Sequence, residues 1–341
     1  MNKMTGNGTE KGTRHIIEEG IRNTATKMLE SGEVDVFIGY EEGTLPLRTT
    51  PAFITCPEDA TRLVWGPACE NNLTVYLPKF QGAVGVVVKG CDVRTLTNLI
   101  LENQISRDKV KIVGVPCSGI IDRDRIRKVL GTEGPIERSM ERPVRSAQVT
   151  ERSLILEGDG FEFEIQLEDV LAPSCETCAY PIPVVYDVLI GDESMARHAK
   201  DSEAGYVEVT RFAELERDAR FSYFSREIER CIQCYACRQA CPLCYCPECF
   251  TDRQSPKWIS RWRGLSDKIL FHLGRILHVA GRCVDCGACR RACPVGIDLR
   301  LLTKNMEKVV KESFEYESGL DIDCLPLLAA YKREDPDDFI L

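Results

Sequence analysis

Two cysteine runs with the same spacing constrain this chain more than any other feature. The first begins at Cys231 and the second at Cys283, and each follows the pattern C-x2-C-x2-C-x3-C-P. The two-residue gaps allow a tight turn to direct three sulfurs to one side, and the fourth cysteine lies beyond them, before a proline. Four converging thiolates are the ligand set of a 4Fe–4S cubane, so each run indicates a cluster.

The fourth cysteine of each run has a separate role. In two-cluster ferredoxins it ligates the cluster held by the other run. Two zinc sites are the alternative, but zinc prefers paired C-x2-C knuckles to two copies of a four-cysteine run. The sequence therefore predicts one 4Fe–4S cluster on Cys231, Cys234, Cys237 and Cys293, and a second on Cys283, Cys286, Cys289 and Cys241.

Three further cysteines, Cys244, Cys246 and Cys249, follow directly after the first run in "CPLCYCPECF". Their spacing does not repeat the ferredoxin pattern. One interpretation is an additional cluster or a zinc ion, because closely spaced free thiols oxidise readily. The other is that they are packing or redundant thiols beside the first cluster. For an additional cluster, the completing ligand would be Cys56, Cys69 or Cys324.

The composition agrees with a soluble protein that works with other proteins. The chain has 341 residues, 18 cysteines and a formal net charge of −9, which argues against nucleic-acid binding. Clustered cysteines in a chain of this size indicate bound metal in a reducing compartment rather than a disulfide scaffold. The polar start lacks a signal core, and no apolar run reaches the length of a membrane helix. We expect a cytoplasmic protein without membrane insertion.

The first part of the chain alternates between helix and strand patterns. Residues 1–15 are expected to form a flexible tail, and an α/β domain with a mixed sheet and flanking helices is expected over 16–212. Its predicted helices cover 16–32 and 92–104. A charged loop is expected over 131–153 and a hairpin over 154–167. The predicted strands are 34–40, 72–77, 83–90, 110–117, 184–192 and 205–211.

From residue 213 to 341 the pattern becomes helical and rich in cysteine. Helices are predicted over 214–230, 266–281 and 298–316. The two cysteine runs are about 40 residues apart, with a helix between them. This wide spacing resembles the α-helical dicluster ferredoxin domain found in the C subunit of heterodisulfide reductase and in the iron–sulfur subunits of succinate dehydrogenase. The resemblance implies an α-helical ferredoxin domain with two 4Fe–4S clusters over 213–341.

Four upstream cysteines stand after predicted strands or in a nearby loop. Cys91 follows "VVVKG", Cys117 follows "VGVP", and Cys175 and Cys178 form "CETC". Such positions meet at the carboxyl edge of an α/β sheet, where ligands collect. Together with "GYVEVTR", these blocks resemble the coenzyme F420 hydrogenase/dehydrogenase beta-subunit family, which includes formate dehydrogenase beta subunits. The resemblance implies that the four cysteines hold a third 4Fe–4S cluster and that FAD is bound. Buried structural thiols are the alternative.

Both resemblances imply an electron-transfer subunit of a cytoplasmic anaerobic oxidoreductase complex, which links a two-electron site to a chain of clusters. The implied partners are heterodisulfide reductase-like, formate dehydrogenase-like or hydrogenase-like redox subunits, or a ferredoxin. One alternative is a catalytic FAD-dependent oxidoreductase acting on F420 or another soluble carrier. The other is a flavin-free adaptor between two subunits. Lys89, beside Cys91, is interpreted as a flavin contact, a group that raises the cluster potential, or a solvated strand-end lysine.

Overall fold

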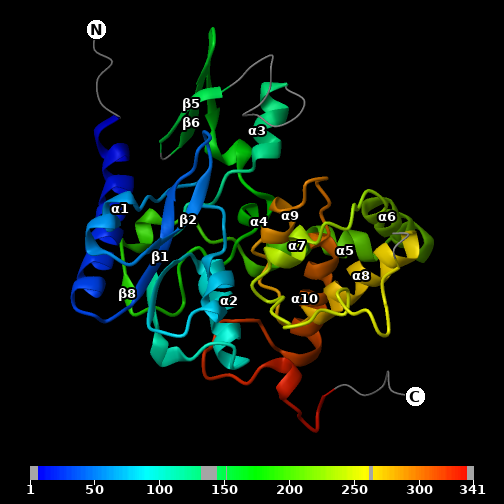
Figure 1. Cartoon of the computed structure of the whole chain (residues 1–341). Helices are drawn as coiled ribbons and strands as arrows, with labels where there is room; N and C mark the ends of the chain where they lie inside the picture. The colour runs from blue at the N-terminus through cyan, green and yellow to red at the C-terminus, as the bar shows by residue number, and fades with distance from the viewer. Residues whose placement is uncertain (1–6, 132–143, 151, 261–263, 336–341) are drawn as a thin grey trace. The chain divides into compact units, whose positions relative to one another are not determined.

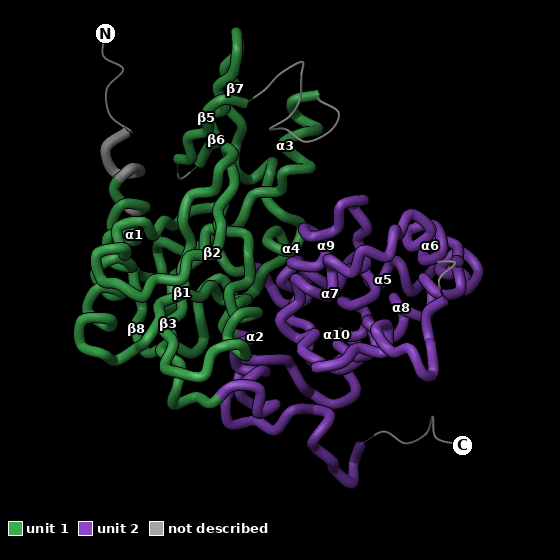
Figure 2. The backbone as a smooth tube through the Cα atoms, viewed as in Figure 1, with its two compact units in different colours: residues 1–93, 106–199 green, residues 94–105, 200–341 purple. Residues whose placement is uncertain are grey.

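The computed structural model describes residues 7–131, 144–150, 152–260 and 264–335 (Figure 1). The chain divides into two compact units, shown in Figure 2. Unit 1 comprises residues 1–93 and 106–199, and unit 2 comprises residues 94–105 and 200–341. Helix α2 (Gly90–Leu101) runs across the boundary between them. The domain limits expected from sequence stay a prediction, because compactness alone does not show that either unit folds independently.

Unit 1 contains a five-stranded mixed sheet in the order β2-β1-β3-β4-β8. Strands β1 and β2 are antiparallel, whereas the pairs β1–β3, β3–β4 and β4–β8 are parallel. All five residues of β3 are buried, as expected for a parallel strand covered on both faces. The strands are β1 (Val36–Glu42), β2 (Thr49–Ile54), β3 (Val84–Val88), β4 (Val110–Gly114) and β8 (Val188–Leu189).

Helix α1 (Asn7–Glu30) packs in this unit through one face. Its buried side chains Ile17, Ile21, Ala25 and Met28 recur at helical spacing. The helix begins nine residues before the predicted start at 16, so the tail expected over 1–15 is helical from Asn7. The helix prediction rests on apolar periodicity, which begins only at Ile16. The polar residues before Ile16 therefore gave no helical signal.

A second sheet of three antiparallel strands, β5-β6-β7, completes unit 1. The predicted hairpin is confirmed as β6 (Ser153–Gly158) and β7 (Phe161–Gln166). Strand β5 (Val144–Val149) lies where a loop was expected over 131–153, and residues 132–143 and 151 fall outside the described residues. Leu154, Leu156 and Ile165 share a buried cluster with residues of helix α3 (Arg123–Leu130).

Two predicted strands are helical in the structure, so those predictions are wrong. The segment 72–77 is a 3-10 helix (Leu73–Lys79) capped by the Asn72 side chain, which accepts hydrogen bonds from the backbone and hydroxyl of Thr74. The segment 205–211 contributes to helix α5 (Val207–Ala213). Its buried residues Val209 and Phe212 are three apart, and this tertiary burial outweighs the β-propensity of the valines.

Unit 2 is helical, as expected. Its core joins Phe224 and Ile228 of α6 to Ile276 of α8, together with Ile297 and Leu299 ahead of α10. The mixed sheet of unit 1 and the helices of unit 2 confirm the predicted fold class. Beside α5, the helices are α6 (Arg217–Glu229), α7 (Ala236–Gln239), α8 (Leu265–His278), α9 (Ala288–Arg291) and α10 (Arg300–Phe314), and unit 1 has a further short helix, α4 (Pro173–Glu176).

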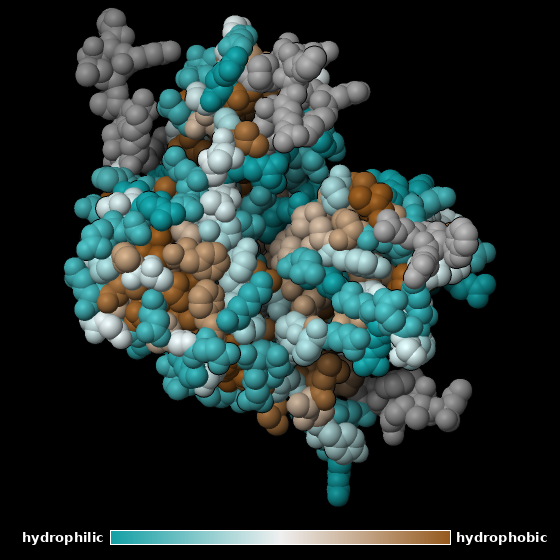
Figure 3. Space-filling model, in the orientation of Figure 1, coloured by the Kyte–Doolittle hydropathy of each residue, from teal (hydrophilic) through white to brown (hydrophobic). Residues whose placement is uncertain are grey.

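No helix among the described residues is both long enough and apolar enough to cross a bilayer. Polar residues cover most of the face seen in Figure 3, with smaller hydrophobic groups between them. The cytoplasmic location stays a prediction.

Candidate iron–sulfur centres

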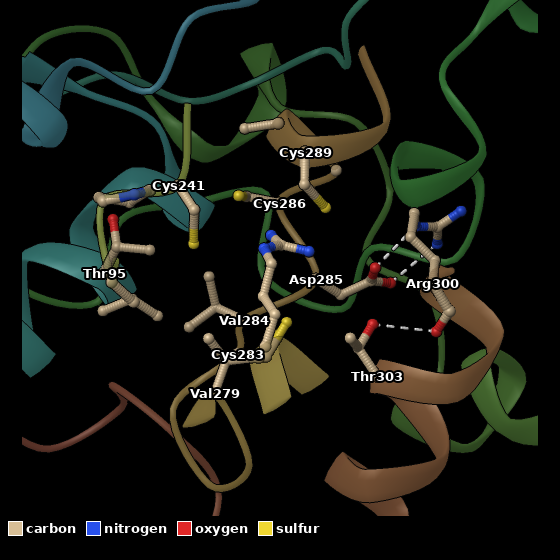
Figure 4. Close-up of a pocket in the computed structure, with 15 residues that line it drawn as sticks. Thr95, Cys241, Val279, Cys283, Val284, Asp285, Cys286, Cys289, Arg300 and Thr303 are labelled. Atoms are coloured by element: carbon tan, nitrogen blue, oxygen red, sulfur yellow. Dashed lines mark hydrogen bonds and ion pairs between the residues drawn. The ribbon is translucent and has the colours of Figure 1, made fainter. Parts of the chain in front are cut away.

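One pocket of unit 2 is lined by four cysteines that come from both ferredoxin runs. Cys283, Cys286 and Cys289 belong to the second run, and Cys241 is the fourth cysteine of the first (Figure 4). This is the ligand set that the sequence predicts for the second cluster. Other lining groups include Arg275 of α8 and the ion pair between Arg300 and Asp285, whose two N–O distances are 2.7 and 2.9 Å.

The two cysteine loops share one local backbone shape. In the first loop, Gln233 and Tyr235 have φ of 52° and 60°, and in the second, Asp285 and Gly287 have φ of 51° and 70°. Each left-handed pair is followed by a one-turn helix, α7 or α9. A left-handed conformation costs a non-glycine residue roughly 1–2 kcal/mol, so the surrounding structure must hold these loops in place.

Cysteines of the first predicted ligand set lie near one another in unit 2. Cys231 and Cys293 pack against the same hydrophobic core. Burial raises the pKa of the Cys231 thiol, and neighbouring Cys293 and Cys234 raise it further. Burial likewise raises the pKa of Cys237 to about 11, with contributions from Cys289, Cys231 and Cys293. Cys293 is therefore beside the first run, as the predicted exchange of fourth cysteines requires.

Three of the four pocket cysteines, Cys241, Cys283 and Cys286, have thiols whose pKa is raised. Burial raises the pKa of Cys286 to about 12 and that of Cys283 well above its ordinary value. The pKa of Cys241 is raised first by a hydrogen bond with the Cys244 thiol and then by burial. Because bound iron replaces the thiol proton, assembly at such a site would release protons.

Several buried polar groups near these cysteines have no partner among the described residues. They are Nε of Arg275, both amide atoms of Gln233 and both ring nitrogens of His272. Buried polar groups are nearly always hydrogen-bonded, so such orphans need an explanation. A cluster with sulfide and thiolate acceptors would supply partners for donors of this kind. The pocket residues therefore fit 4Fe–4S clusters, which would be held by the two predicted cysteine sets.

The extra cysteines have different surroundings. The pKa of Cys244 is lowered chiefly by its hydrogen bond with the Cys241 thiol. At Cys249, burial opposes ionisation, but hydrogen bonds from Thr251 and Arg238 lower the pKa overall. Cys246 is exposed. Within the described ranges, no three Cys, His, Asp or Glu side chains are arranged around a single metal ion. The additional metal site stays a prediction, as do the contributions of Cys56, Cys69 and Cys324.

In unit 1, three of the four upstream cysteines lie close together. Burial raises the pKa of Cys117 to about 12, and the Cys175 and Cys178 thiols add to the shift. The Cys117 amide donates to the carbonyl of Pro181, and Cβ of Cys175 lies close to Gly119. Cys91 follows Gly90, and the backbone of Gly90 packs directly against the carbonyl of Tyr180. This close contact brings Cys91 near the segment that follows Cys178. The loop that carries Cys175 and Cys178 therefore borders both strand-end cysteines.

Replacement of Gly90 by alanine is expected to disrupt this upstream site. An added Cβ would lie 1.9 Å from the Tyr180 carbonyl oxygen, a backbone atom that cannot move without shifting the cysteine loop. We expect the Gly90→Ala variant to lose about four irons per chain, measured by iron analysis. Gly12→Ala is the control, since its Cβ meets no atom within 4 Å. Full iron content in both variants would contradict the expectation.

Lys89 is buried, and its interpretation as a solvated lysine is wrong. Only 3% of the residue is exposed, and its ammonium lies 2.8 Å from the Asp92 carboxylate. It also donates to the Tyr40 hydroxyl at 2.5 Å and to the Cys69 carbonyl at 3.1 Å. Burial alone would lower the pKa of Lys89, but Asp92 and its other neighbours raise it overall. These contacts use most of the hydrogen-bonding capacity of the Lys89 ammonium, which leaves little for a flavin phosphate. The flavin contact stays an untested prediction.

Sequence reasoning missed two charged residues near these sites, Asp92 and Arg275. Both stand in stretches that were interpreted only as helices. Arg275 offered a signal, because it occupies the buried face of α8 with Phe271, His272 and Ile276. A charged residue on the apolar side of an amphipathic helix needs a buried counter-charge.

Comparison with known proteins supports this description. Residues 82–219 match the family described as the C terminus of the coenzyme F420 hydrogenase/dehydrogenase beta subunit. Residues 227–297 match the family described as 4Fe-4S dicluster domain. The two matches confirm the two resemblances expected from sequence, one to the F420 hydrogenase/dehydrogenase beta-subunit family and one to 4Fe–4S dicluster domains. The dicluster match spans all eight cysteines of the two runs.

Two curated proteins are similar over most of the chain. One is the F420-dependent formate dehydrogenase subunit beta of Methanocaldococcus jannaschii, with 22% identity over 88% of this chain and 91% of the relative. The other is the F420-dependent formate dehydrogenase 1 subunit beta of Methanococcus maripaludis, with 22% identity over 88% and 90%. A chain of the F420-reducing [NiFe] hydrogenase complex from Methanosarcina barkeri aligns with 49% of this chain and 62% of its own length. Its identity is 19% and its TM-score 0.36, a likeness too low to carry an argument.

Proposed function

We propose that this chain is an iron–sulfur electron-transfer subunit of an oxidoreductase complex of the formate dehydrogenase or hydrogenase type. The observation that carries the proposal is the pocket in which Cys241 of the first run joins Cys283, Cys286 and Cys289 of the second. Such exchange is the arrangement of a two-cluster electron carrier. The names of the two curated relatives support the formate dehydrogenase class.

Three 4Fe–4S clusters are proposed, and each would accept and donate one electron at a time. The twelve cysteines would hold the clusters, and the partial burial of all but Cys234 would limit the access of water to them. The third cluster would be held in unit 1 by Cys91, Cys117, Cys175 and Cys178. The ligands proposed for the other two are Cys231, Cys234, Cys237 and Cys293, and Cys283, Cys286, Cys289 and Cys241.

The proposed partners are other redox subunits. A formate dehydrogenase-like or hydrogenase-like catalytic subunit would supply electrons, and FAD, if bound by this chain, would couple them to two-electron hydride chemistry. A heterodisulfide reductase-like flavoprotein or a ferredoxin is a further proposed partner, suggested by the wide helical spacing of the two runs. We propose that the complex operates anaerobically in the cytoplasm.

Iron, sulfide and flavin analysis of the anaerobically purified chain tests the proposal. We expect about twelve irons and about twelve acid-labile sulfides per chain, which corresponds to three cubanes. About sixteen irons would support a further cluster at Cys244, Cys246 and Cys249. About four irons or fewer would contradict both the upstream site and the dicluster assignment.

The same preparation distinguishes two other candidate functions. Release of one FAD per chain on denaturation would support a catalytic flavoprotein that acts on F420 or another soluble carrier. A preparation with about twelve irons and no flavin would support a flavin-free adaptor that connects two subunits. The dicluster match favours electron transfer in either case, because it describes cluster binding and specifies no substrate.

A further inference from the structure

Arg275 is a buried cation whose surroundings in unit 2 contain cysteines of both ferredoxin runs. It lies in the last turn of α8, lines the cysteine pocket, and is 7% exposed. One guanidinium nitrogen donates to the carbonyl of Cys237 at 3.4 Å. Its charge also acts on Cys241, Cys244 and Cys289, so it borders both predicted ligand sets.

Among the residues that the structure describes, no carboxylate balances the charge of Arg275. In the part of unit 2 that the structure describes, Arg300 pairs with Asp285 and Arg282 pairs with Glu102, but no ion pair involves Arg275. Its Nε has no hydrogen-bond partner among the described residues. A buried, unpaired cation is strongly unfavourable, so a negative group must compensate for it in the assembled protein.

The negative groups within reach are cysteine sulfurs. A 4Fe–4S cluster held by four thiolates carries net negative charge and becomes more negative when it takes up an electron. A fixed cation nearby therefore stabilises the reduced form more than the oxidised form, and charge and hydrogen bonding to sulfur are among the factors that set cluster potentials. Because Arg275 borders both ligand sets, its charge acts on both potentials at once.

We propose that Arg275 is a positioning residue that balances the charge of the two ferredoxin-type clusters and raises both of their reduction potentials. The inference rests on the proposed function, since it requires that the two clusters are present. The effect of Arg275 is electrostatic and does not involve ligation. The presence of the clusters and the shift in their reduction potentials can therefore be tested independently.

The test is an EPR-monitored redox titration of the full-length chain, with dithionite as reductant, on wild type and Arg275→Met. Methionine keeps much of the side-chain volume and removes the charge. We expect the reduction equilibrium of each of the two clusters to become about tenfold less favourable, a downward shift of about 59 mV for a one-electron couple. Arg275→Lys keeps the charge and is expected to shift each potential less than Arg275→Met does.

Arg220→Met is the matched control, because Arg220 is an exposed arginine on α6 of the same unit. In this variant the reduction equilibrium constant of each cluster is expected to stay within about a factor of two of the wild-type value. If Arg275→Met does not assemble clusters, Arg275→Gln replaces it as a neutral variant with a hydrogen-bonding side chain. Cluster loss in both neutral variants, with retention in Arg275→Lys, would also support the proposed charge balance.

Two results would overturn the inference. One is an Arg275→Met or Arg275→Gln chain with wild-type iron content and unchanged potentials. The other is equal cluster loss in all three Arg275 variants, which would assign Arg275 a packing role only. Iron analysis of each sample separates these results from failure of the proposed function, because wild-type protein without clusters would contradict the function itself.

Discussion

Replacement of Cys286 by alanine is expected to lower the iron content from about twelve to about eight atoms per chain and to abolish one EPR signal. The reason is that Cys286 lines the shared pocket with Cys241, Cys283 and Cys289, so its removal would leave the proposed cluster with three cysteine ligands. Cys324→Ala is the control for that EPR signal, because Cys324 is exposed and belongs to neither run. An unchanged iron content in the Cys286 variant would contradict the assignment of the pocket.

The exchange of fourth cysteines makes the same experiment sharper. Cys241 is in the first run, yet its alanine variant should abolish the same EPR signal as Cys286→Ala, because both cysteines line one pocket. Since the Cys244 thiol is hydrogen-bonded to Cys241, the variant is also made with Cys244→Ala, which prevents ligand replacement. Loss of the signal that Cys231→Ala abolishes would show instead that each run holds its own cluster.

Removal of the buried ammonium by Lys89→Met is expected to destabilise the chain by about 3–5 kcal/mol. The substitution leaves the Asp92 carboxylate, only 1% exposed, without its buried cation. Thermal unfolding followed by circular dichroism is expected to show a midpoint lowered by roughly 10 °C. The double variant Lys89→Met/Asp92→Asn should recover part of the loss, because no charge then remains buried at this position.

Lys111→Met is the matched control for this effect. Lys111 pairs with Glu33 at 2.7 Å, close to the distance in the Lys89–Asp92 pair, but the two side chains are 35% and 41% exposed. Solvent screening makes the contribution of such an exposed pair to stability small. Equal unfolding midpoints for Lys89→Met and Lys111→Met would contradict the expectation that burial makes the Lys89–Asp92 pair contribute more to stability than the exposed pair does.

Cysteine spacing predicted that Cys241 lies beside the second run, whereas residue composition failed to predict some local structure. Cysteine spacing encodes ligand geometry directly, so the meeting of Cys241 with the second run could be expected without any coordinates. Strand β3 and helix α8 were also predictable, since a continuous apolar run and a 3.6-residue period leave few alternatives. In contrast, the composition of "NLTVYL" favours a strand, but the segment forms a 3-10 helix. That helix is capped by the Asn72 side chain and contains Pro78.

The charged groups beside the sites were harder to predict. Whether Lys89 is solvated or buried depends on Tyr40 and Asn71, which approach it from other parts of unit 1. The same holds for Arg275, because only the packing around α8 shows that no carboxylate among the described residues pairs with it. Long-range contacts of this kind leave no periodic signal in the sequence, whereas ligand spacing does.

The matched backbone of the two cysteine loops has a consequence for how the two clusters depend on each other. The left-handed pair at Gln233 and Tyr235 recurs at Asp285 and Gly287, and a one-turn helix follows each pair. Under the proposed exchange, each loop supplies three ligands to one cluster and the fourth ligand to the other. Unfolding of either loop would therefore remove ligands from both clusters.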